Sequence, residues 1–180
     1  MKQTFKIKGR LVFDPPEITS KHSRQSNWKK VAFLEFDGDI KKYYRWFVKK
    51  RYNLHLSESI RKAHVTFIND SHRDLGENLS KWNKVKKKWN GKTIEIKLST
   101  DVHSDGVYWW LVVPEESRGQ LHSIRKEVGL YRPHFGLHMT FGVAVNTKDD
   151  SLEGNALKAT RQTEAHSKYI VDLLIKNLIE

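Results

Sequence analysis

The feature of this sequence that most restricts its possible folds is a short pattern that occurs twice. Residues 64–67 read His-Val-Thr-Phe and residues 138–141 read His-Met-Thr-Phe. In a β-strand, residues i and i+2 lie on one face, and the residues between them lie on the other. Each pattern therefore predicts a strand that presents an imidazole beside a hydroxyl, while its apolar residues anchor the opposite face in a core.

The elements expected before each pattern occur in the same order. Hydrophobic periodicity predicts two strands, an amphipathic helix and the motif strand in each half of the chain. In the first half these are 5–13, 31–36, 40–48 and 64–67; in the second they are 94–98, 107–113, 121–128 and 137–145. The two patterns start 74 positions apart, at 64 and 138. We predict an α+β fold of duplicated strand-strand-helix-strand units, related by a pseudo-twofold axis around a central groove.

This duplication predicts a single bilobal domain over residues 1–180. Lobe 1 covers about residues 1–70 and lobe 2 about residues 91–146. A linker helix at 71–90 is expected between them, because its apolar residues recur at helical spacing and Gly91 follows. A further helix is expected at the C-terminal end, over 155–180.

Composition excludes several classes of chemistry. The chain has no cysteine, which rules out disulfides, thiolate zinc sites and cysteine nucleophiles. It has no apolar run long enough to span a membrane and no signal-peptide pattern, so we expect a soluble, cytoplasmic protein. We also expect a monomer. Its net charge of +12 favours phosphate-bearing partners such as RNA or an oligonucleotide.

Two imidazoles and two hydroxyls at one site suit the cleavage of a phosphodiester. One group must take a proton from the nucleophile, and another must give a proton to the leaving oxygen. Histidine does both near neutral pH, because its ordinary pKa is about 6.5. The hydroxyls of Thr66 and Thr140 can donate to the phosphoryl oxygens as charge develops there. We expect no metal, since Pro133 and Gly136 disfavour a helix that would pair His134 with His138. We also expect no cofactor, since the sequence has neither a P-loop nor a G-x-G-x-x-G motif.

The paired motifs resemble those of the 2H phosphoesterase superfamily, which is named for two H-x-[ST]-x motifs. Its members include LigT-like 2′-5′ RNA ligases, cyclic nucleotide phosphodiesterases and viral enzymes that cleave signalling oligonucleotides. The resemblance covers roughly residues 5–145 and rests on the motifs at 64–67 and 138–141. It implies a bilobal α+β fold with both motifs facing a groove, metal-free catalysis, and catalytic roles for His64, Thr66, His138 and Thr140.

Other residues are candidates for binding the substrate. Tyr131 and Arg132 precede the second motif and resemble a segment that lines the groove in members of this superfamily, which implies a role in phosphate binding. Trp109 and Trp110 are neighbours in a strand, so one should face the core while the other is available to stack on a base. Phe135 is a further stacking candidate.

Two functions remain open at this point. The first is a phosphodiesterase that acts on a 2′,3′-cyclic phosphate, a 2′-5′ linkage or a cyclic oligonucleotide; run in reverse, the same groups would ligate. A viral enzyme that removes a host defence messenger is a special case of it. The second is a catalytically silent module of the same fold that binds RNA. Intact motifs favour the enzyme.

Overall fold

The structure is a computed structural model that describes residues 3–16, 30–59, 61–69, 79–131, 133 and 136–144. The predicted helix at 155–180, residues 71–78 of the predicted linker helix, Arg132 and Phe135 lie outside these residues. The fold is α+β, as predicted. Its elements, in chain order, are β1 (Thr4–Phe13), β2 (Val31–Glu35), α1 (Ile40–Tyr52), β3 (Leu56–Ser57), β4 (His64–Asn69), α2 (Leu79–Trp89), β5 (Thr93–Ser99), β6 (Val102–Ser104), β7 (Tyr108–Val112), the 3-10 helix η2 (Glu115–Ser117), α3 (Gly119–Val128) and β8 (His138–Ala144).

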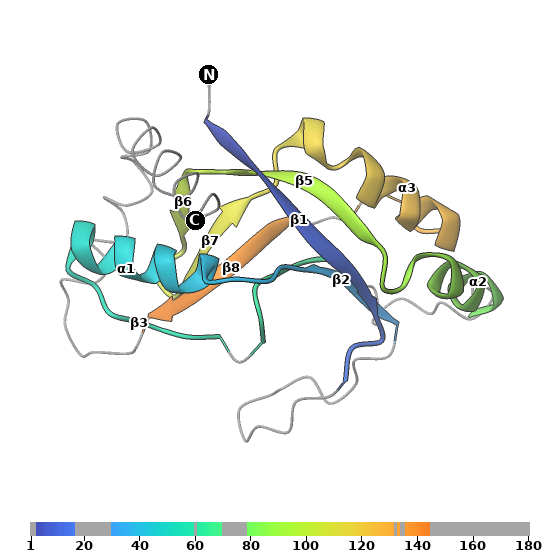
Figure 1. The fold of residues 1–180 in the computed structure, drawn as a ribbon, viewed down its shortest axis with the longest axis horizontal. Coiled ribbons are helices and arrows are strands. Elements are labelled where there is room, and N and C mark those ends of the chain that lie inside the picture. Colours follow the sequence, from blue (N-terminus) through green and yellow to red (C-terminus); the bar gives the residue numbers. More distant parts are fainter. Residues whose placement is uncertain are drawn as a thin grey trace.

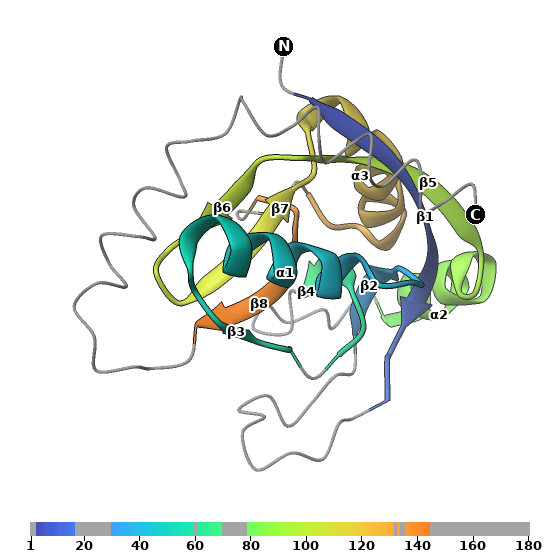
Figure 2. The same cartoon turned by 60° about the vertical axis from the view of Figure 1, so that its left-hand side comes forward.

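The strands form one antiparallel sheet, in the order β5-β1-β2-β4-β8-β7-β6, with β3 paired to β8. Its first and last strands, β5 and β6, are separated in the chain only by Thr100 and Asp101. The sheet therefore curls, and Figures 1 and 2 show β5 arching above β7 and β8. The two motif strands, β4 and β8, are neighbours at its centre.

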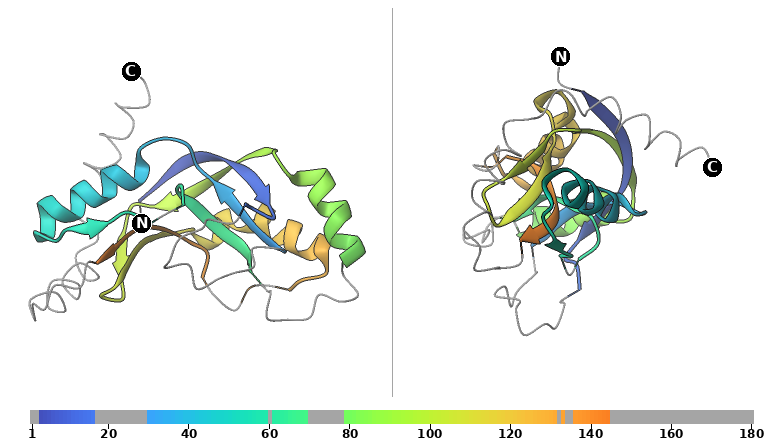
Figure 3. Two further views of the ribbon diagram at one scale, coloured as in Figure 1. Left: turned by 90° about the horizontal axis from the view of Figure 1, so that it is seen from below. Right: turned by 90° about the vertical axis from the view of Figure 1, so that its left-hand side faces the viewer.

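α1 and α3 each pack against the motif strand of the other half. α1 precedes β4 in the chain but contacts β8 and β3, whereas α3 precedes β8 but contacts β4 and α2. Figure 3 shows α1 at one end of the molecule and α2 with α3 at the other. α3 ends at Gly129, whose φ of 88° is accessible to glycine and strained for other residues, as its position after the helix predicts.

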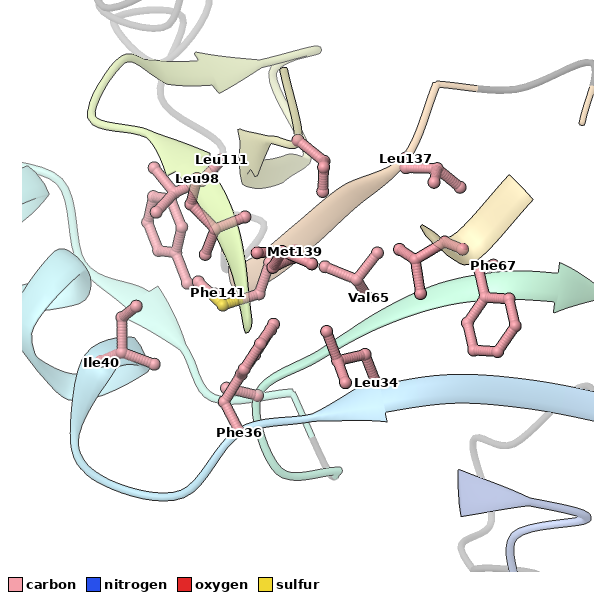
Figure 4. Packing of buried hydrophobic residues seen from close by; sticks show 14 of the residues in the cluster. Leu34, Phe36, Ile40, Val65, Phe67, Leu98, Leu111, Leu137, Met139 and Phe141 are labelled. Atoms are coloured by element: carbon pink, nitrogen blue, oxygen red, sulfur yellow. The ribbon is translucent and has the colours of Figure 1, made fainter. Parts of the chain in front are cut away.

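The apolar residues of both motifs lie in one core. Val65, Phe67, Met139 and Phe141 are fully buried, and Figure 4 shows Val65 and Met139 close together between β4 and β8, with Phe141 beside Met139 and Phe67 farther along β4. Burying a side chain of this size stabilises the fold by about 1.5–3 kcal/mol. The core thus holds the back faces of β4 and β8, as the alternation predicted.

A β-bulge interrupts each motif strand at the same motif position. On β4, Ile68 pairs with Ala32 and Thr66 pairs with Phe33, which leaves Phe67 without an opposite residue on β2. On β8, Gly142 pairs with Trp109 and Thr140 with Trp110, which leaves Phe141 unpaired in the same way. A bulge turns the residues beyond it onto the opposite face from the one that simple alternation gives.

The described part of the predicted linker helix is α2, and its apolar face packs on the rest of the molecule. Trp82 and Val85 are buried. The Trp82 indole and the Lys86 ammonium both donate to the Asp14 carboxylate, at 3.2 and 2.7 Å. This pair of bonds fixes α2 against the end of β1.

Candidate active site

The site forms where β4 and β8 lie side by side. Val65 is opposite Met139 in this antiparallel pair. The same register sets His64 beside Thr140, and Thr66 beside His138. Each imidazole therefore lies next to the hydroxyl of the other motif. The chain folds this way because the apolar residues between them face the core.

The four motif side chains line one cavity of about 280 Å³, together with Asn69 at the end of β4. His64, Thr66 and Thr140 are half-buried, and His138 is exposed. The structure thus brings together all four residues that the sequence nominated for catalysis. A cavity of this size is enough to admit a phosphoryl group with the atoms around it.

Each imidazole makes the same kind of hydrogen bond, from Nδ1 to the backbone carbonyl two residues earlier. Nδ1 of His64 lies 2.8 Å from the Lys62 carbonyl oxygen, and Nδ1 of His138 lies 2.8 Å from the Gly136 carbonyl oxygen. A carbonyl only accepts hydrogen bonds, so Nδ1 carries the hydrogen in each ring. Nε2 is then the nitrogen left for chemistry: it accepts a proton when the ring is neutral and donates one when the ring is charged.

Burial lowers the pKa of the His64 imidazole below its ordinary value of 6.5. The positive charges of Arg61 and Lys41 also lower it, while the bond to the Lys62 carbonyl and the Glu35 carboxylate oppose this change. His64 is therefore neutral at pH 7, which is the state that a general base requires.

A buried lysine holds the loop that leads into β4. Lys41 of α1 is 4% exposed, and its ammonium donates to the carbonyls of Ser59 and Arg61, at 2.8 and 2.6 Å. Burial lowers the pKa of Lys41, and the nearby Glu58 carboxylate opposes this effect. Because Lys62 follows Arg61 directly, these bonds also steady the carbonyl that orients His64.

An aromatic ring lies beside each histidine. The Phe33 ring is 4.8 Å from the His64 ring and is buried. The Trp110 ring is 5.8 Å from the His138 ring, is half-buried, and stacks on His103 at 6.3 Å. The two tryptophans face opposite sides of the sheet, as predicted, but Trp109 is fully buried in the core. The prediction that Trp109 binds substrate was therefore wrong, because its side chain is covered by the core.

Asn69 is the lining residue that sequence reasoning missed. Strict alternation from His64 and Thr66 places Asn69 on the core face. The bulge at Phe67 shifts this alternation by one residue, so that Ile68 is buried and Asn69 reaches the cavity. No pattern in the sequence marks this bulge, because it arises in the pairing of β4 with β2.

The remaining candidates lie apart from this cavity or outside the described residues. Tyr131 is 90% exposed and lines a separate cavity of about 480 Å³, with residues of α3 that include His122 and Lys126. Arg132 and Phe135 fall outside the described residues. Among the residues that are described, no three His, Asp or Glu side chains gather closely enough to bind a metal ion.

Comparisons with protein-family models, with curated proteins and with solved structures found no significant match to this chain. Within the described part of the chain, no helix has both the length and the apolar character needed to cross a bilayer.

Proposed function

We propose that the chain is a metal-independent phosphodiesterase of the 2H type that acts on RNA-type phosphodiesters. The observation that carries this proposal is the geometry of the two histidines. Each points Nε2 away from a carbonyl that holds Nδ1, and both lie with two threonines around one cavity. This arrangement suits one reaction that needs a base and an acid on either side of a phosphorus atom.

The reaction is a displacement at phosphorus. The oxygen of a water molecule, or of a neighbouring hydroxyl, attacks phosphorus, and Nε2 of one histidine takes its proton. The bond from phosphorus to the leaving oxygen breaks, and Nε2 of the other histidine protonates that oxygen. The hydroxyls of Thr66 and Thr140 donate hydrogen bonds to the nonbridging oxygens. These bonds stabilise the negative charge that the oxygens carry in the transition state.

The electrostatics of the site favour His64 as the base. Its buried ring is neutral at pH 7, so it is ready to accept the proton of the nucleophile. His138, on the exposed side of the cavity, then serves as the acid. This assignment places the leaving group on the side of β8.

We also infer that the two halves are copies of one strand-strand-helix-strand unit, arranged about a pseudo-twofold axis that passes between β4 and β8. The order of the main elements, β1-β2-α1-β4 and β5-β7-α3-β8, supports this inference, and so do the bulges at Phe67 and Phe141. The bonds of both histidines to the carbonyl two residues earlier are a third shared feature.

A nucleotide substrate agrees with the surroundings of the site. The half-buried Trp110 lies beside His138 and offers a ring for a base to stack on, a contact that contributes about 1–3 kcal/mol in nucleic-acid binders. The net charge of +12 attracts the phosphates of an oligonucleotide, so we expect binding to weaken as salt rises.

One experiment tests this function directly. Purified protein is incubated with 2′,3′-cyclic nucleotides, 2′-5′ oligomers and cyclic oligonucleotides, and the products are resolved by chromatography and mass spectrometry. His64→Ala and His138→Ala should each lower turnover by about 10²–10⁴-fold. His55→Ala, at an exposed position outside the cavity, is the matched control. Binding without turnover by the wild type would show an RNA-binding module instead.

A further inference from the structure

We propose that Arg125 is a positioning residue for the two-histidine site, because its guanidinium ties the backbone of the first motif to the segment that precedes the second. This inference rests on the proposed function. It goes further by naming a residue outside the cavity that fixes how the two motifs are placed relative to each other.

Arg125 lies in the last turn of α3 and is 3% exposed. Its Nη1 donates to the Phe67 carbonyl at 2.7 Å, and its Nε donates to the Tyr131 carbonyl at 2.8 Å. A planar guanidinium with several fixed donors can serve two acceptors in different directions, which a lysine ammonium does less well. One side chain therefore joins two parts of the backbone that are 64 positions apart in sequence, at 67 and 131.

The first of these bonds acts on the motif at 64–67. Phe67 is the residue that the bulge leaves without a partner on β2, and it follows Thr66 directly. A bulged residue lacks the regular ladder on that side, so its geometry depends on other contacts. The bond from Arg125 supplies one and so fixes the end of the motif, including the Thr66 hydroxyl.

The second bond acts on the approach to His138. Tyr131 opens the stretch that leads to β8, and the Leu137 carbonyl at its other end accepts from the Val113 N–H at 2.9 Å. Gly136, whose carbonyl holds the His138 ring, lies just before Leu137. Arg125 and Val113 thus hold the backbone at Tyr131 and at Leu137, and Leu137 lies between Gly136, whose carbonyl orients the imidazole, and His138 itself.

The burial of a charge argues that this arrangement is specific. An unpaired buried guanidinium is costly, and these two carbonyl acceptors offset part of that cost. If α3 needed only apolar packing here, an aliphatic side chain would serve. Leu121, one turn earlier, does so and is fully buried.

The test compares Arg125→Met with Leu121→Ala. Both changes weaken α3, but only the first removes polar bonds to the motif strand and to the Tyr131 segment. We expect Arg125→Met to lower kcat by on the order of 10–100-fold with KM nearly unchanged, because a misplacement of about 1 Å in a catalytic group costs this much. Leu121→Ala should lower Tm while folded protein keeps its kcat. Arg125→Lys, which retains the charge, replaces Arg125→Met if the latter does not fold.

A second measurement needs no substrate. Long-range ¹H–¹⁵N NMR spectra report which nitrogen of each neutral histidine ring carries the hydrogen. In the wild type both His64 and His138 should carry it on Nδ1, and the Arg125 variants should lose this preference at His138. Wild-type kcat and an unchanged His138 tautomer in the Arg125 variants would overturn the inference, as would an equal loss of kcat in Leu121→Ala. If the wild type cleaves none of the substrates, the proposed function fails, while the NMR result still decides the role of Arg125.

Discussion

Val65 and Met139 lie opposite each other across β4 and β8, and both are fully buried. This one pairing decides the geometry of the candidate site, because the residues on either side of each partner point the other way. A slip of one residue in this register would move the histidines and threonines to the core face. The buried pair thus keeps all four polar side chains at the cavity.

Met139→Ala should lower the free energy of unfolding by about 2–5 kcal/mol, because it leaves a cavity behind the two motif strands. Met139→Leu nearly conserves volume and should cost less than about 1.5 kcal/mol. Urea denaturation measures both variants. Equal stability of the alanine variant and the wild type would show that this position does not hold the pair of strands together.

The stability of the protein should depend on the protonation of His64. Burial lowers the pKa of this ring in the folded protein, so the unfolded chain binds the proton first as the pH falls below about 6.5. His64 therefore does not reduce the free energy of unfolding above this pH. As the pH falls from there toward the pKa of His64 in the folded protein, the free energy of unfolding decreases. His64→Asn should flatten this part of the curve of unfolding free energy against pH. A ring titration by NMR at or above 6.5 would contradict the prediction.

Thr66→Val and Thr140→Val should lower kcat with little change in KM. Their hydroxyls are proposed to bind the phosphoryl oxygens most strongly when charge has built up in the transition state. Steady-state kinetics on the substrate that the screen identifies distinguishes the two parameters. Thr66→Ser and Thr140→Ser retain the hydroxyl and serve as controls that should keep most of the rate. A rise in KM alone would assign the threonines to substrate binding.

The two adjacent tryptophans should respond differently to substitution. Trp110→Ala removes a half-buried ring beside His138 and should weaken oligonucleotide binding by about 1–3 kcal/mol, with a small change in Tm. Trp109→Ala removes a fully buried side chain and should cost about 3–5 kcal/mol of stability. Fluorescence anisotropy and thermal unfolding separate these effects. Unchanged binding in Trp110→Ala would remove this ring from the proposed substrate site.

Activity should persist in EDTA. The described cavity is lined by two imidazoles, two hydroxyls and one amide, a set without the carboxylates that divalent ions commonly use at phosphodiester sites. Turnover is measured before and after dialysis against the chelator, and after readdition of Mg²⁺, Mn²⁺ or Zn²⁺. Loss of activity that one of these ions restores would contradict the two-histidine mechanism.

The sequence by itself determined the local structure of the site. An alternation with a period of two places His64 with Thr66, and His138 with Thr140, in any strand that buries the intervening residues. Helical spacing likewise located α1 and α3, and Gly129 marked the end of α3. These features depend only on residues that are close in sequence, so they do not depend on where the segment lies in the tertiary structure.

The tertiary structure alone decided how the two motifs meet. The pairing of Val65 with Met139 depends on which strands become neighbours, and no local pattern specifies this. The same holds for the bulge that brings Asn69 into the cavity, for the burial of Trp109, and for the reach of Arg125 to Phe67. Each arises from packing between segments far apart in sequence, where the fit of side chains in a shared core selects one register among several that the alternation allows.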